Sequence, residues 1–289
     1  MMQIFIHGFV AAAKGEAVSA MVTNQTPTQT PWWQPQAPRP GHWQHYQLGF
    51  LSLYLQRLEQ DWYLAWALEQ GTGSVQEDMS RPWLTQNLSS LPEGLVPSRY
   101  SFAEAPTELL LKPRLLDRPV VFKTHQPVHV PPGEKVTFYI SSPVCVSLEL
   151  GKPAMTLLEL PSQRLSDTWF GPSTREGELC YGAKTRARNS LEDLPLRPHR
   201  AVTPVTIHNR AEDILAIDKL SIPVPLLAVY ADAKNNLWTQ SVQLEHAQGE
   251  SFSALTIGTA PPGLKHLAPA RELGQTGKLV RAFTRLFSN

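Results

Sequence analysis

Apolar and polar residues alternate along much of this chain, and that alternation constrains its fold more than any other feature of the sequence. In residues 135–140, 144–150 and 238–245, apolar side chains fall mostly at every second position, with polar ones between them. A period of two is that of a β-strand with one face on a core and the other toward solvent. Such segments recur about every ten residues, a spacing typical of a sandwich or barrel.

The 26 prolines favour the same fold class, because proline interrupts the interior of a helix. Turn-forming residues at 131–134 and 232–236 separate strands in the manner of hairpins. Residues 223–230 are a nearly continuous apolar run, which predicts a central strand covered on both faces. We therefore predict an all-β fold, an antiparallel β-sandwich or jelly-roll-like arrangement.

Two segments before residue 107 are harder to assign. In residues 46–68, the alternation of Leu51, Leu53 and Leu55 predicts a hairpin, although several apolar residues also fit a helical stripe. The aromatic content of this segment favours strands, and the helix remains the alternative. Residues 71–106 are polar, contain prolines and show no clear period, which predicts a long excursion over the surface.

The two ends of the chain differ from the middle. We expect residues 1–42 to be a leader and a disordered linker, because residues 23–42 are rich in Pro, Thr and Gln. Trp32 and Trp33 are expected to pin this linker to the domain surface. Whether Met1 or Met21 is the native start stays open.

Residues 43–272 are expected to form the β-sandwich domain, as one unit or as two β subdomains with a break near 107–117 or 190–200. Residues 273–289 predict a short amphipathic helix with basic residues off its apolar face. That face is a candidate partner-binding surface, formed by Leu279, Val280, Phe283, Leu286 and Phe287.

Charge and composition exclude several classes of protein. The formal net charge is +1, so no global field steers the chain onto nucleic acid. No run of 18 or more apolar residues is present, and therefore no transmembrane helix is expected. Two cysteines, Cys145 and Cys180, are too few for a disulfide framework and are expected to be buried thiols in a reducing cytoplasm.

No motif of known catalytic chemistry is present. The chain lacks a glycine-rich phosphate loop and a nucleophile elbow, so no catalytic residue, nucleotide or other cofactor is predicted. His125 and His129 lie four residues apart and would share a face of a strand. Two candidate ligands do not make a metal site, and we favour solvated histidines near a sheet edge.

The segment 169–181 combines aromatic and charged residues around glycines and a proline, which plain strands do not require. We take it, with two basic residues that follow, as a candidate recognition surface consisting of Trp169, Arg175, Glu176, Glu178, Tyr181, Arg186 and Arg188. A basic set, Lys184, Arg186, Arg188, Arg197, His199 and Arg200, fits either an anion-binding stripe or a solvated face. We favour the solvated face because the whole chain is nearly neutral.

These residues also carry a family resemblance. Trp169–Tyr181, Leu116-Asp-Arg-Pro-Val-Val121, Pro132-Gly-Glu134, Arg197-Pro-His-Arg-Ala-Val-Thr-Pro-Val205, Ile222-Pro-Val-Pro-Leu-Leu227 and Leu237-Trp-Thr239 together resemble the prokaryotic domain-of-unknown-function family number four hundred and thirty-two. The resemblance covers about residues 46–287. It implies an all-β fold and no agreed activity, and it suggests a mechanosensitive channel as a partner.

Two functions follow as hypotheses. The first is a non-enzymatic binding or accessory protein that acts through a protein partner, with a membrane channel as the version suggested by the resemblance. It would be cytoplasmic and would reach the membrane through that partner. The alternative is a carbohydrate- or small-ligand-binding, or hydrolytic, β-sandwich that uses Trp169, Tyr181, Glu176 and Glu178. This alternative requires the four side chains to line one pocket. The oligomeric state is not predicted.

Overall fold

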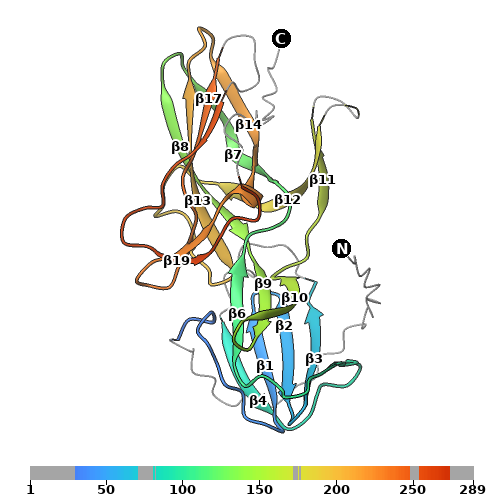
Figure 1. Ribbon diagram of the computed structural model, residues 1–289. Coiled ribbons are helices and arrows are strands. Elements are labelled where there is room, and N and C mark those ends of the chain that lie inside the picture. The colour runs from blue at the N-terminus through green and yellow to red at the C-terminus, as the bar shows by residue number, and fades with distance from the viewer. Residues whose placement is uncertain are drawn as a thin grey trace.

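The computed structural model describes residues 30–70, 81, 83–171, 175, 177–247 and 254–273. These residues form β-strands in four sheets, stacked as two lobes (Figure 1). Within them no α-helix is found, and the one helical turn is the 3₁₀ turn η1 at Val224–Leu226. The chain is thus all-β, as predicted. Apart from Leu273, the predicted C-terminal helix lies outside the described residues.

The lower lobe contains two sheets. The N-terminal sheet has the order β4-β1-β2-β3-β5 and consists of β1 (Trp43–Leu48), β2 (Leu51–Arg57), β3 (Asp61–Leu68), β4 (Leu84–Leu88) and β5 (Ser98–Ser101). The middle sheet has the order β10-β9-β6 and consists of β6 (Leu109–Arg114), β9 (Cys145–Leu150) and β10 (Met155–Pro161). All pairs in both sheets are antiparallel.

The upper lobe also contains two sheets. The hairpin sheet has the order β11-β12-β7-β14 and consists of β7 (Val120–Val130), β11 (Asp167–Phe170), β12 (Glu178–Ala187) and β14 (Leu215–Ile222). The large sheet has the order β18-β17-β13-β16-β15-β19, with β8 also paired to β13. It consists of β8 (Lys135–Pro143), β13 (Arg200–Asn209), β15 (Val229–Ala231), β16 (Leu237–Trp238), β17 (Val242–His246), β18 (Ala254–Ile257) and β19 (Lys265–Ala268).

The upper sheets are mixed, and the prediction of purely antiparallel strands is wrong for three pairs. Strand β12 runs parallel to β7, and β13 runs parallel to both β16 and β17. A parallel pair needs a long crossover connection, which alternation within a strand does not reveal. The end of β12 also reaches β8, where Tyr139 and Arg188 exchange backbone hydrogen bonds. This contact curls the upper lobe into a half-barrel.

Several segments confirm the predictions from local pattern. Residues 46–68 form strands β1 to β3 rather than a helix. The turn at 131–134 joins β7 to β8, and the turn at 232–236 joins β15 to β16. In the second turn, Asp232 accepts hydrogen bonds from the backbone of Lys234 and Asn236 and from the Trp238 indole.

Three predictions made outside the clearest alternation are wrong. Residues 223–230 are not one central strand, because prolines 223 and 225 divert the chain into η1 before β15. Residues 71–106 are not a featureless excursion, since they contain β4 and β5, the two edges of the N-terminal sheet. The solvated face predicted for the basic set fails for Arg197, His199 and Arg200, which are all buried.

One continuous apolar core joins the lobes. It contains Trp62 from the N-terminal sheet, Leu148 from the middle sheet, Phe122 from the hairpin sheet and Ile140 from the large sheet. Burial of this apolar area is the main force holding the lobes together. Trp32 belongs to the same cluster, and its indole donates a 2.9 Å hydrogen bond to the carbonyl of Pro198. The segment predicted as a linker therefore contributes to the core.

Candidate functional site

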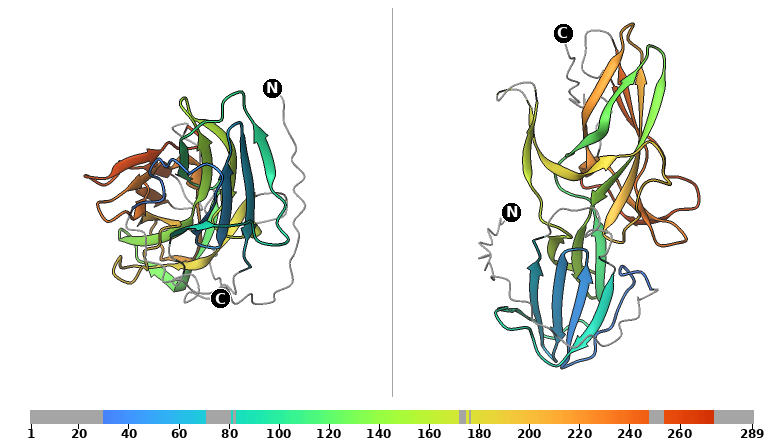
Figure 2. Two further views of the ribbon diagram at one scale, coloured as in Figure 1. Left: turned by 90° about the horizontal axis from the view of Figure 1, so that it is seen from below. Right: turned by 180° about the vertical axis from the view of Figure 1, so that it is seen from behind.

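The segment singled out in the sequence forms a hairpin that extends from the upper lobe, as Figures 1 and 2 show from opposite sides. Strands β11 and β12 are antiparallel, with Trp169 directly opposite Leu179 and Asp167 opposite Tyr181. Residues opposite each other in a sheet place their side chains on the same face. These four residues therefore share one face, which we call the Trp169 face.

Two large apolar side chains lie exposed on the Trp169 face. Trp169 is 48% exposed and Leu179 is 44% exposed. The Trp169 indole lies against Gly177, where an added Cβ would come within 2.8 Å of the ring. Two residues along β12, Tyr181 is half-buried and packs against the main core. The face is thus the core-facing side of the sheet, continued beyond the point where the core ends.

Charged residues surround the base of this face. The Tyr181 hydroxyl donates a 2.9 Å hydrogen bond to Asp117, and the Arg118 guanidinium lies 5.2 Å from the centre of the Tyr181 ring. Arg118 also pairs with Asp167 at 3.1 Å. Burial, together with the adjacent Asp117 carboxylate, raises the pKa of Tyr181 to about 12. The phenol is therefore neutral near pH 7 and donates its hydrogen bond to Asp117.

The opposite face of the hairpin is closed. Phe170 is paired with Glu178 and Thr168 with Cys180, so these residues point away from Trp169. Phe170 and Cys180 form a small buried cluster with Val121. Glu178 accepts a 3.3 Å hydrogen bond from Ser221, which is buried. The strand geometry therefore separates Glu178 from Trp169 and Tyr181, and these three cannot line one pocket.

The remaining predicted residues are placed less completely. Arg175 is exposed at the tip of the hairpin, and Arg188 contributes backbone bonds to β8. Glu176 and the side chain of Arg186 lie outside the described residues. Sequence reasoning missed Leu179, Asp117, Arg118 and Asp167 as members of the site. Asp117 and Arg118 belong to the segment 116–121, which contributed to the family resemblance. No local pattern, however, indicated that this segment lies beside residues 167–181.

No metal or thiol chemistry is apparent in the described part of the chain. No group of three or more His, Cys, Asp or Glu residues there is arranged to hold an ion. His129 lies on β7 opposite Ala216, and the side chain of His125 is outside the described residues. Burial raises the pKa of Cys145 and of Cys180 to about 11 in each case. Neither thiol is therefore activated as a thiolate nucleophile.

The candidate partner helix 279–287 lies outside the described residues, so its apolar face stays a prediction. Among the residues that the structure describes, no helix is long and apolar enough to cross a membrane.

Comparisons with known proteins give one match. A family model with the description "Protein of unknown function (DUF432)" matches residues 32–287, which confirms the resemblance seen in the sequence. No curated protein and no solved structure matches the chain. The match begins at Trp32, the first residue of the buried aromatic pair Trp32–Trp33.

Proposed function

This chain belongs to the family described as protein of unknown function (DUF432), and because that membership carries no activity, we propose its function from the Trp169 face. The proposed function is non-enzymatic: the protein binds a protein partner through this face. The observation that supports the proposal is the exposure of Trp169 and Leu179 side by side on a projecting hairpin. Tryptophan is among the residues most enriched at the strongest contacts of protein–protein interfaces.

The composition of the face fits a protein partner. Trp, Tyr and Arg are the residues most enriched at binding hot spots, and Trp169, Tyr181 and Arg118 lie within one patch. Arg118 and Asp167 keep 37% and 62% of their side-chain surface exposed, which provides a polar rim. A partner that buries Trp169 and Leu179 would gain about 25 cal/mol for each Å² of apolar surface removed from water.

We further propose that the partner is a membrane channel, so that the protein is cytoplasmic and reaches the membrane through it.

We also propose a more specific description of the fold. The hairpin sheet and the large sheet would form a β-sandwich, and the two lobes would be the two β subdomains expected from the sequence.

A capture experiment with matched variants tests the proposal. Purified protein carrying Trp169→Ala or Leu179→Ser is compared with wild type for partners retained from a detergent-solubilised membrane fraction. The control is Leu196→Ser, because Leu196 is 42% exposed, close to the 44% of Leu179, but lies outside the hairpin. The proposal requires a protein lost in both hairpin variants and kept in the control, and then bound directly once purified.

Two results would count against the proposal. Retention of the same proteins by all variants would exclude the Trp169 face as the binding surface. A directly bound partner that is not a channel would leave the binding function in place and exclude the channel version. Removal of residues 273–289 in a separate variant shows whether the C-terminal segment, rather than the hairpin, is the contact.

The second candidate is carbohydrate binding, and the exposed Trp169 indole is the observation that favours it, since sugars stack on aromatic rings. Its polar partners would be Asp167 and Arg118 rather than Glu178, which lies on the other face. Titration with oligosaccharides, followed by tryptophan fluorescence in wild type and Trp169→Ala, separates this candidate from the first.

A further inference from the structure

The chain passes between the lobes through a short linker, residues 115–119. It connects β6 of the middle sheet to β7 of the hairpin sheet. Leu115 and Leu116 are buried in the core, whereas Asp117 is exposed. The first two residues of the linker are therefore held in place by burial, whereas polar contacts hold the residues that follow. Polar contacts hold the linker from two sides: Arg271 bonds to Leu115 on one side, and on the other the hairpin contacts Asp117, Arg118 and Pro119.

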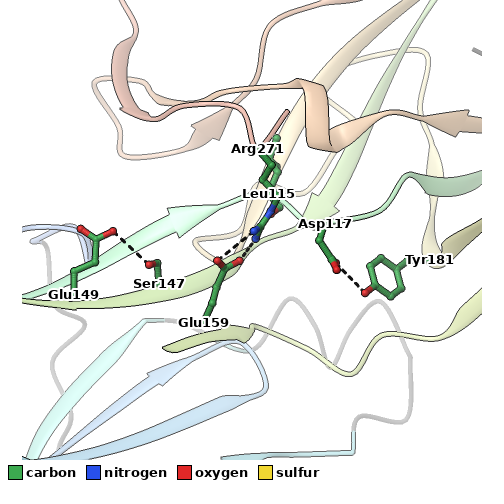
Figure 3. A network of polar contacts seen from close by, with 7 residues as sticks. All are labelled: Leu115, Asp117, Ser147, Glu149, Glu159, Tyr181 and Arg271. Atoms are coloured by element: carbon green, nitrogen blue, oxygen red, sulfur yellow. Dashed lines mark hydrogen bonds and ion pairs between the residues drawn. The ribbon is translucent and has the colours of Figure 1, made fainter. Parts of the chain in front are cut away.

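The first contact comes from Arg271, near the C-terminal end of the described chain. Its backbone N–H donates to the carbonyl of Pro225 at 2.9 Å, which holds this residue on the upper lobe. Its side chain then crosses to the linker and to the lower lobe. The guanidinium donates to the carbonyl of Leu115 and forms a two-point ion pair with Glu159 of β10 (Figure 3).

This ion pair is more than a surface contact. The side chains of Arg271 and Glu159 are 20% and 25% exposed, so both charges are partly removed from water. Burial lowers the pKa of Arg271, although arginine stays charged at any relevant pH. A partly buried charge that loses its partner costs more than an exposed one, because water cannot fully replace that partner. Loss of Glu159 or Arg271 would therefore disturb this junction.

The second contact comes from the hairpin. Asp117, two residues after Leu115, accepts the hydrogen bond from the Tyr181 hydroxyl. Figure 3 shows Asp117 between Arg271 and Tyr181, with Glu159 on the far side of Arg271. The Asp117 charge also acts on Arg271, since it favours the protonated guanidinium. Polar contacts thus connect β10 to Leu115 and Asp117 to the base of the Trp169 face, and the backbone of the linker joins the two sets.

We propose that Arg271 is a latch: it fixes the linker to the middle sheet, and through Asp117 and Tyr181 it fixes the base of the β11–β12 hairpin. The C-terminal segment and the Trp169 face are then thermodynamically coupled. Release of Arg271 loosens the hairpin. Because such coupling is reciprocal, anything that orders the hairpin also stabilises the contacts of Arg271 with Leu115 and Glu159. The latch goes beyond the proposed binding function and does not depend on it.

Hydrogen exchange on the isolated protein tests the latch without a partner. Peptides covering residues 167–182 are followed by mass spectrometry in wild type, Arg271→Gln, Glu159→Gln and Tyr181→Phe. Each variant is expected to speed exchange in the hairpin by ~5-fold or more, the usual lower range of such couplings. The double variant Arg271→Gln with Tyr181→Phe should exchange no faster than the faster single variant, because both act through one chain of contacts.

Arg210→Gln is the matched control. Arg210 also pairs with a glutamate, Glu245, at 2.7 Å, but it follows directly after β13 of the large sheet and is 55% exposed. The control should leave hairpin exchange unchanged. An unchanged hairpin in folded Arg271→Gln, or effects that multiply in the double variant, would overturn the latch. If Arg271→Gln does not fold, Glu159→Gln decides by the same criterion, since it keeps the bond from Arg271 to Leu115.

Discussion

Trp169 and Leu179 face each other across two antiparallel strands, and both stay nearly half exposed although their face of the sheet continues into the core. Tyr181, two residues further along the same face, already packs against that core. The apolar face of the hairpin is therefore longer than the core that covers it. Soluble proteins that expose such a surface commonly use it to bind something.

Substitutions of neighbouring residues on β11 should have opposite consequences. Trp169→Ala should change the free energy of unfolding by less than ~1 kcal/mol, because Trp169 is 48% exposed and lies beyond the edge of the core. Phe170→Ala should cost about 3 kcal/mol, because Phe170 is 5% exposed and a cavity would remain. Urea unfolding of both variants measures the difference. Equal losses would mean that Trp169 contributes to the core.

A methyl group at Gly49 should be much more harmful than one at Gly133. Both glycines have positive φ, +61° and +78°, so alanine at either position costs about 1 kcal/mol of backbone strain. At Gly49, the added Cβ would also lie 2.7 Å from the ring of His199, whereas at Gly133 nothing lies within 4 Å. Overpacking should add about 1–3 kcal/mol for Gly49→Ala alone.

Thermal unfolding of the two alanine variants gives the comparison, with wild type as the reference. A midpoint for Gly49→Ala as high as that for Gly133→Ala would show that His199 can move aside, and that the junction between Gly49 and His199 is less tightly packed than the structure indicates.

Stability should fall as the pH drops below about 6.5, in part because of His45. Burial lowers the pKa of His45 from 6.5, and the charge of Glu69 offsets this only in part. The unfolded chain then binds a proton at a higher pH than the folded protein does. The contribution of His45 is complete above pH 6.5 and is lost as the pH falls toward the lower folded pKa.

His45→Gln tests the pH effect. Urea midpoints measured from pH 7.5 to 5 should decline less steeply in this variant than in wild type, whatever its absolute stability. The ring of His45 stacks on Tyr54 with centroids 4.6 Å apart, so the variant is also expected to lower stability at every pH. Parallel pH curves for the two proteins would contradict a role for His45.

The two thiols should be inert in the native protein. Cys145 is 7% exposed, Cys180 is fully buried, and burial raises the pKa of each. Because the thiolate is the reactive form, a thiol reagent at pH 8 should modify neither group until the protein unfolds. Reaction followed by absorbance, with and without denaturant, checks this. Cys180→Ser identifies the site if one group reacts early.

Local pattern predicted the parts of the fold that depend on local forces. Strand β9 alternates Cys145, Ser147 and Glu149 with apolar residues, and its period alone shows that it is a strand. The same pattern could not show that Ser147 would also be buried. Strand β9, at the centre of the middle sheet, is covered on both faces, and only its neighbours in space determine that.

Only part of the candidate site was predicted, because its geometry also depends on neighbours in space. The segment 169–181 was recognised as unusual, but the sequence could not show which of its side chains share a face. One register, with Trp169 opposite Leu179, brings Asp167 and Tyr181 together and sends Glu178 to the other side. A shift of one residue would reverse the faces, and the forces that select the register act across the sheet.

Residues distant in sequence were beyond any local pattern. Arg197, His199 and Arg200 read as a solvated basic run, yet Arg200 is buried and donates to Ser141 of β8 and to Gln163, which lies just after β10. Charged side chains enter an interior only where the fold supplies acceptors for them. That supply depends on strands far away in the chain.

The sequence by itself determined that this chain is all-β, where several of its strands and two of its tight turns lie, and which family it belongs to. These depend on the period of two, on proline and glycine, and on blocks of residues in order. Only the tertiary structure decided the parallel pairs, the exposed Trp169 face and the contacts of Arg271 with Leu115 and Glu159. The contacts of Arg271 join residues more than 100 positions apart, the parallel pairs join strands that are not neighbours in the chain, and the exposed face depends on where the core ends. Such relations arise only when the whole chain packs.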